Sequence, residues 1–312
     1  MRRRQVDVSD AHRRQESIGR SYLDHLSDAD LGLLIRAAGP GTAAVAAVST
    51  ARSQPHLVES LLSNSRAFDA LFSQQEGDNT LLGASPFLTF ALAVHRGLHE
   101  LQGSTMVEEW IGPGRRIPVL GVEDLRTFLS DPARRLFLTE LLASYTHVAS
   151  GSVWTQTRRG WRRRRFSELD PVRLASLLEV VPEAERTWVY RRLGDVCLFL
   201  TGIFPDHTAT HGFGQLDEGR LLRAARLGER SPLVAQAPAE PVLDLGAVGL
   251  LEHLGERWYR MACSVALSPG TATMEVVADV AGRFRQARRI LNFITDRYLF
   301  PFRSSWFGVP SA

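Results

Sequence analysis

The chain has 312 residues, 44% hydrophobic and 23% charged, a composition typical of a globular protein with one large or two ordinary domains. Its formal net charge is only +3, and all 37 of its basic side chains are arginine, which excludes chemistry that needs a lysine, such as Schiff-base formation or a Walker A phosphate loop. A GC-rich genome is the simplest source of this bias, so the distribution of charge is more informative than its total.

The first third of the chain is rich in helical patterns. Residues 1–26 are polar and arginine-rich, and they predict a flexible N-terminal arm. Ser27 precedes two acids and starts a helix, and Pro86 begins a strong helix that ends at Gly103. We therefore expect an N-terminal helical domain over residues 27–104.

Two β-hairpins interrupt the helices. Residues 110–120 predict two short extended pieces around a glycine–proline turn, and residues 152–166 predict two strands around a tight turn that contains Gly160. Between them, apolar periodicity predicts helices over 123–129 and 132–148. This order is similar to a winged helix-turn-helix, in which the second helix enters the DNA major groove and the wing contacts phosphates.

The remainder is again helical. Residues 183–203 predict a long helix whose second half is apolar all round and therefore buried, and residues 205–214 predict a loop. We expect a mainly α protein, a helical bundle with two short β-hairpins, the second being the wing of a winged helix-turn-helix-like unit. After the N-terminal domain we expect a winged-helix-like unit plus the buried helix at 105–230, and a proline-rich connector at 231–243. A C-terminal helical hairpin at 244–312 then packs on the preceding domain, with helices near 245–266 and 272–299.

Two segments carry a resemblance. The run LGDVCLFLTGIFP at 193–205 and the run GERWYRMA at 255–262 resemble a group of uncharacterised helical bacterial proteins, most of them from actinobacteria and myxobacteria. The resemblance covers roughly residues 105–300. It implies a helical fold and no particular activity.

The second hairpin holds the densest positive charge of the chain. Guanidinium groups can fork onto phosphate oxygens, and each neutralised phosphate releases counterions, while Arg134 and Arg135 would lie where base-reading side chains usually lie. Alternation places Arg163 and Arg165 on the opposite face, where acids such as Glu168 or Asp170 would pair with them. The alternative is an exposed edge strand that charge keeps soluble. The predicted nucleic-acid contacts are Arg134, Arg135, Arg158, Arg159, Trp161, Arg162 and Arg164.

The last helix offers a second basic surface. Arg285, Arg288 and Arg289, together with Asn292, are expected on the face opposite its apolar stripe, which favours a solvated face over a binding site. Asp195 lies within an apolar helical stretch, where an ion pair with an arginine one turn earlier is favoured over a catalytic acid.

Histidines occur in two pairs. His95 and His99 are four residues apart on a predicted helix, and His207 and His211 repeat that spacing in the predicted loop. Such spacing can bring two imidazoles to one metal ion, although structural histidines are more common. A joint metal site would require the two segments to meet.

The two cysteines, Cys197 and Cys263, lie in apolar helical stretches, as expected of buried, reduced thiols in a cytoplasmic protein. No signal-peptide core and no run of roughly 20 apolar residues is present, so no membrane partner is expected.

The sequence leaves three hypotheses about function. The first is a non-enzymatic, cytoplasmic, nucleic-acid-binding protein without a cofactor. The second is a helical scaffold that binds another protein, and the third is a metal-dependent enzyme that uses the four histidines. The sequence gives no oligomeric state.

Overall fold

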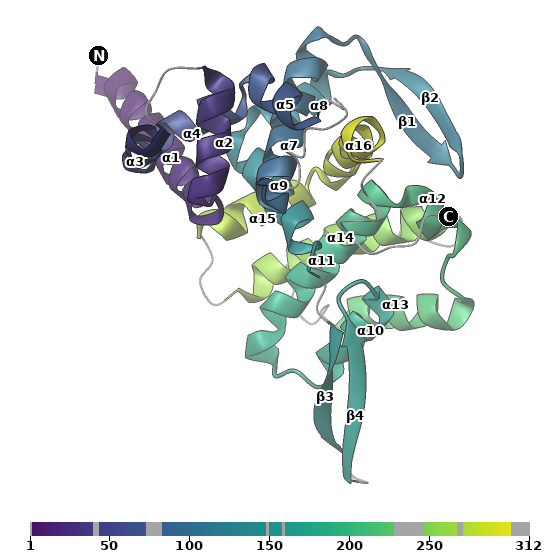
Figure 1. Cartoon of the computed structure of the whole chain (residues 1–312). Coiled ribbons are helices and arrows are strands. Elements are labelled where there is room, and N and C mark those ends of the chain that lie inside the picture. Colours follow the sequence, from purple (N-terminus) through teal and green to yellow (C-terminus); the bar gives the residue numbers. More distant parts are fainter. Residues whose placement is uncertain are drawn as a thin grey trace. The chain divides into compact units, whose positions relative to one another are not determined.

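The computed structural model describes residues 2–39, 44–72, 83–147, 150–157, 160–227, 246–266 and 271–300 (Figure 1). For residues 2–12, 44–46, 150–157, 160–166 and 226–227 only the backbone is described. The protein is mainly α with two antiparallel two-stranded hairpins, which confirms the predicted fold class. None of the described helices is long and apolar enough to cross a membrane.

The chain divides into two compact units. The first comprises Met1–Thr105, Gly121–Thr146 and Asp296–Trp306, and the second comprises Met106–Leu120, His147–Thr295 and Phe307–Ala312. These boundaries differ from the predicted domains, because the chain leaves the first unit for the first hairpin and then returns to it.

The first unit is built from helices alone. Its core surrounds α7, of which Phe90, Leu92 and Val94 are fully buried, and α9 packs against α7. Asp30 closes a capping box with Ser27 at the start of α2 and also accepts a 2.8 Å hydrogen bond from the Ser85 amide. The elements are α1 (Arg2–His25), α2 (Asp28–Ala38), α3 (Ala44–Ser53), η1 (Pro55–Leu57), α4 (Val58–Leu62), α5 (Ser65–Phe72), α7 (Pro86–Gly103), α8 (Glu123–Ser130) and α9 (Pro132–Ser144).

The expectation of a flexible arm over residues 1–26 was wrong. Residues 2–25 form α1, and Ile18, Tyr22 and Leu23 on this helix are buried. Gly19 lets α1 approach η1, since a Cβ there would lie 3.1 Å from Cβ of Pro55 and closer still to its backbone. The polar composition of the segment concealed one short apolar face.

The second unit combines helices with both hairpins. It contains β1 (Met106–Gly112), β2 (Arg115–Leu120), β3 (Ser150–Thr157), β4 (Gly160–Ser167), α10 (Pro171–Ala175), η2 (Ser176–Glu179), η3 (Glu183–Glu185), α11 (Arg186–Ile203), α12 (Pro205–Thr210), α13 (Gln215–Leu227), α14 (Gly246–Val265), α15 (Ala272–Ala281) and α16 (Phe284–Ile294). A π-helical turn, η5 (Thr295–Leu299), follows α16, and from Asp296 onward it belongs to the first unit.

Helices α11 and α14 form the core of the second unit. A Cβ on Gly194 would lie 2.8 Å from Cγ of Tyr259, and a Cβ on Gly255 would lie 2.8 Å from Cβ of Cys197. Glycine therefore permits the close approach of these two helices. The second half of α11 is buried as predicted.

Two predictions for this unit were wrong. Residues 205–210, expected in a loop, form α12 with Pro205 in its first turn. The single helix expected over 272–299 is broken at Gly282, which ends α15 before α16 begins. The predicted connector at 231–243 lies outside the described residues.

Candidate nucleic-acid interface

The second hairpin forms a two-stranded ribbon, as predicted. Strands β3 and β4 pair in continuous antiparallel register from Ser150 opposite Ser167 to Thr157 opposite Gly160. In Figure 1 the ribbon extends away from the helices of its own unit, with α10 beside its base. We call β3, β4 and the turn between them the arginine ribbon.

The chemistry of this ribbon rests on residues whose side chains are not among those described. Arg158 and Arg159, which separate the two strands in the sequence, lie outside the described residues, and only the backbone is described at Trp161, Arg162 and Arg164. The register places Arg162 opposite Thr155 and Arg164 opposite Val153.

The two acids expected to pair with the ribbon arginines have arginine partners in the helical part of the unit. Glu168 accepts a 2.9 Å hydrogen bond from Arg192 on α11. Asp170 caps α10 by accepting hydrogen bonds from the amides of Val172 and Arg173, and it forms a 2.9 Å ion pair with the Arg173 guanidinium. Both acids therefore anchor the base of the ribbon to helices.

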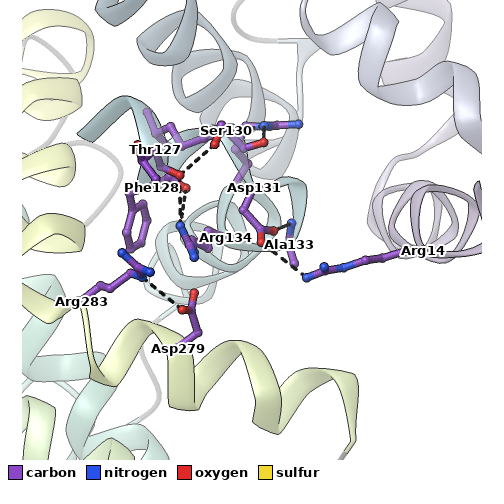
Figure 2. A network of polar contacts seen from close by, with 11 residues as sticks. Arg14, Thr127, Phe128, Ser130, Asp131, Ala133, Arg134, Asp279 and Arg283 are labelled. Carbon is purple, nitrogen blue, oxygen red and sulfur yellow. Dashed lines mark hydrogen bonds and ion pairs between the residues drawn. The ribbon is translucent and has the colours of Figure 1, made fainter. Parts of the chain in front are cut away.

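Arg134 and Arg135, predicted to read bases, do not face solvent. Figure 2 shows Arg134 directed back at α8, where it donates to the carbonyl oxygens of Thr127 at 3.1 Å and Phe128 at 3.3 Å. The residues Arg134 and Arg135 are only 9% and 7% exposed. Because the last carbonyls of a helix lack partners within it, these guanidinium groups satisfy the C-terminal end of α8.

Arg135 is fixed by a further contact. It donates to the Leu129 carbonyl at 2.7 Å and forms a 2.8 Å ion pair with the buried carboxylate of Glu59. The prediction that this pair of arginines enters a major groove is therefore corrected: they hold α8, α9 and α4 together.

The winged-helix arrangement is corrected as well. Helices α8 and α9 belong to the first compact unit, whereas the arginine ribbon belongs to the second. A winged helix-turn-helix is one compact domain, so the order of elements in the sequence was not sufficient evidence for it.

The predicted second basic surface on α16 is largely neutralised by the protein itself. Glu109 on β1 lies 3.5 Å from a guanidinium nitrogen of Arg285 and 3.3 Å from one of Arg289. Arg288 pairs with Glu252 at 2.8 Å and is only 4% exposed, and burial lowers its pKa. The expected solvated face is instead packed against β1.

The four histidines do not form one cluster. His95 is buried between Tyr22 and Ser63, whose hydroxyls lie 3.3 Å and 2.9 Å from its two ring nitrogens, while His99 is exposed. His207 and His211 belong to the other compact unit. Over the described part of the chain, no group of three or more His, Cys, Asp or Glu side chains is arranged to hold a metal ion.

Asp195 is a structural carboxylate. It accepts a 2.8 Å hydrogen bond from Tyr259 and lies 3.7 Å from a guanidinium nitrogen of Arg192. Burial raises its pKa, against the charges of Arg191 and Arg192 and the Tyr259 hydrogen bond. The neighbouring Cys197 is buried, and burial also raises its pKa, so its thiol is unreactive.

Comparison of the chain with protein-family models, with curated proteins and with solved structures finds no match.

The structure adds a feature that the sequence did not reveal. An open groove of about 510 Å³ lies beside α10, between the end of α12 and the start of α13. We call it the α10–α13 groove. Its lining includes two acids, Asp170 and Asp217, two arginines, Arg173 and Arg220, and the rings of His207, His211 and Phe213. The histidine pair and the arginines of 217–227 were visible in the sequence, but they lie on two separate elements, α12 and α13.

Proposed function

We propose that this protein binds nucleic acid through the arginine ribbon, with arginine side chains contacting the sugar–phosphate backbone. The observation that carries the proposal is the position of four consecutive arginines, Arg162 to Arg165, on a strand whose described pairing is with β3 alone. Two further arginines, Arg158 and Arg159, lie between the two strands in the sequence. A slender ribbon can lie in a groove of a duplex or along a strand without steric conflict from helices.

Arginine suits this role because its planar fork binds two phosphate oxygens at once, and because each contact releases counterions from the polymer. The burial of Arg134 and Arg135 removes the base-reading part of the initial hypothesis. We therefore propose binding that depends on phosphate contacts and discriminates little between base sequences.

The test is a salt titration of binding to a short fluorescent DNA, measured by anisotropy. Replacing Arg158, Arg159, Arg162 and Arg164 by alanine should weaken binding and reduce the slope of log K against log salt by about 0.7–0.9 for each phosphate that is no longer neutralised. The wild-type protein must itself show a clear salt slope, and a slope near zero would refute the proposal.

The matched control removes the same charge elsewhere. Four exposed arginines of the first unit, Arg13, Arg14, Arg20 and Arg66, are replaced by alanine in a second variant. We expect that variant to retain most of the affinity and of the slope. Equal losses in the two variants would mean that overall charge, and no particular surface, governs binding.

A protein-binding scaffold is the second candidate, and the first hairpin favours it. Met106 and Leu120 lie opposite each other on β1 and β2 and are 52% and 75% exposed. Contiguous exposed apolar surface of this kind is what a protein partner would cover. Leu120→Glu would abolish such an association and leave the nucleic-acid salt slope unchanged.

A further inference from the structure

The α10–α13 groove is continuous with the base of the arginine ribbon. Strand β4 ends at Ser167, and the groove lining begins two residues later, at Leu169. Helix α10 contacts both β4 and α13. A polymer that follows the arginines of β4 toward the helices therefore arrives at this groove.

The groove offers aromatic surface. The rings of His207 and His211 are stacked, with centroids 4.2 Å apart and an angle of 28° between their planes, and Phe213 is also part of the lining. Burial and the neighbouring His211 lower the pKa of His207, which keeps this imidazole neutral near pH 7. Aromatic rings can stack on a nucleobase whatever its identity.

The groove also offers cations that a phosphate can recruit. Arg173 is paired with Asp170 and Arg220 with Asp217, each at 2.9 Å, and the two arginine side chains are 57% and 65% exposed. Exposed pairs of this kind contribute only about 0.2–1 kcal/mol, so exchanging the carboxylate for a phosphate costs little.

The basic path extends beyond the groove. A second hollow, of about 350 Å³, shares Val172, Arg173 and Arg220 with the α10–α13 groove, and its other charged lining residues are Arg223 and Glu179. Arg223 is exposed on the same helix as Arg220, further from the acid Asp217. Arginines thus continue along α13 from the aromatic end of the groove.

We infer that the α10–α13 groove binds an unpaired nucleotide, with a base stacked on the His211 and Phe213 rings and the flanking phosphates held by Arg173 and Arg220. The partner is then single-stranded nucleic acid. This inference rests on the proposed function of the ribbon. In a duplex the faces of the bases are already stacked, whereas a single strand can turn one base into a pocket. The groove volume falls within the roughly 300–1,000 Å³ of small-ligand sites, large enough for one nucleotide and too small for a duplex.

The experiment compares a fluorescent oligothymidylate with a duplex of equal length, using the full chain at one salt concentration. The wild-type protein should bind the single strand more tightly than the duplex. A double variant, His211→Ala with Phe213→Ala, should lose roughly 5- to 100-fold in affinity for the single strand, the range expected for loss of base stacking, and keep its affinity for the duplex.

Two controls separate stacking from misfolding. Trp188→Ala removes a half-exposed aromatic ring of the same unit that lies outside the groove lining, and it should leave both affinities unchanged. His211→Phe with Phe213 intact should retain single-strand binding, because a phenyl ring stacks as an imidazole does. Thermal melting of each variant confirms that it is folded.

The outcomes distinguish this inference from the proposed function. If the groove variant binds the single strand as the wild-type protein does while the ribbon variant loses affinity, the groove inference is overturned and the ribbon proposal stands. Equal wild-type affinities for strand and duplex would also overturn it. If the ribbon variant keeps full affinity, the proposed function itself fails.

Discussion

Tyr259 donates a 2.8 Å hydrogen bond to the carboxylate of Asp195, and the ring of the same tyrosine lies against the bare Cα of the adjacent Gly194. Asp195 is 7% exposed. The contact between α11 and α14 therefore unites a close helix approach with a buried charge. The role of both residues in this structure is packing.

Asp195 predicts a specific pH dependence of stability. Burial raises the pKa of its carboxyl in the folded state, so the folded protein binds this proton more tightly than the unfolded chain does. The destabilising contribution of the charge is present at neutral pH and is relieved as the pH falls through the raised pKa. The stability of the wild-type protein relative to Asp195→Asn should therefore increase as the pH is lowered from neutral toward 3.8, the ordinary pKa of the carboxyl group. Urea unfolding of both proteins measures this, and a difference independent of pH would contradict it.

Gly255 provides a test of the close helix packing. A Cβ at this position would collide with the Phe284 ring and lie 2.8 Å from Cβ of Cys197, so Gly255→Ala should destabilise the protein by about 1–3 kcal/mol. A Cβ on Gly219 of α13 would have no atom within 4 Å, and Gly219→Ala should stabilise by about 0.5–1 kcal/mol through helix propensity. Thermal melting and urea unfolding compare the two. If the two substitutions changed stability by similar amounts, α11 and α14 would pack less closely than the contact distances at Gly255 indicate.

Local signals in the sequence were sufficient for most of the elements. The proline at position 86, the capping Ser27 and the glycine turns of both hairpins each act through neighbouring residues, and the helices and strands they predict are present. Long-range pairing was not predictable in this way. Glu109 and Arg289 are separated by 180 positions, and nothing local indicates that β1 would neutralise α16.

The candidate site was only partly predictable for the same reason. The ribbon followed from strand alternation around Gly160, but Arg134 and Arg135 were misassigned because a sequence does not show which helix end a guanidinium will satisfy. The α10–α13 groove combines residues of α10, α12 and α13 with the loop that carries Phe213. Its histidines were candidate metal ligands in the third hypothesis, because their spacing is all that the sequence shows of them.

Arg135 should be essential for folding and irrelevant to nucleic-acid affinity. Its ion pair with Glu59 joins side chains that are 8% and 11% exposed, so Arg135→Ala leaves a buried carboxylate without a counter-charge and should cost about 3–5 kcal/mol. Arg135→Met combined with Glu59→Leu removes both charges and should recover much of that loss. Chemical unfolding gives the stabilities. A folded double variant that had lost nucleic-acid binding would revive the base-reading role.

His95 predicts a loss of stability in acid. Burial, with the charge of Arg135, lowers its pKa from 6.5 to about 3, so the imidazole is neutral when folded and accepts a proton more readily when unfolded. Above pH 6.5 the histidine is neutral in both the folded and the unfolded state and does not affect the free energy of unfolding. As the pH falls from 6.5 toward 3, the free energy of unfolding decreases by roughly 4–5 kcal/mol in total. His95→Gln keeps polar atoms near Tyr22 and Ser63 but has no such titration. Its unfolding free energy should fall less steeply between about pH 6 and 4, and identical pH profiles would assign the acid sensitivity to other groups.

Glu109 should fix the first hairpin to α16. The Glu109 side chain is 11% exposed, and its carboxylate faces Arg285, Arg288 and Arg289. The side chains of Arg288 and Arg289 are themselves only 5% and 14% exposed. Arg288 keeps a second acid partner, Glu252, when Glu109 is removed. The charge of Arg289, which is also largely buried, then loses its ion pair with Glu109, so Glu109→Ala should destabilise the protein by about 3–5 kcal/mol.

Glu275→Ala is the matched control for this substitution, because Glu275 is exposed on α15 and its loss should change stability by no more than about 0.5 kcal/mol. Hydrogen exchange adds local resolution to the unfolding measurements. If Glu109 anchors the hairpin, the amides of β1 and β2 should exchange faster in Glu109→Ala than the amides of α11. Uniformly faster exchange throughout the second unit would show that the carboxylate supports the whole core. Unchanged exchange in β1 would show that the hydrogen bonds from Trp110 and Gly114 to Asp206 suffice to hold the hairpin.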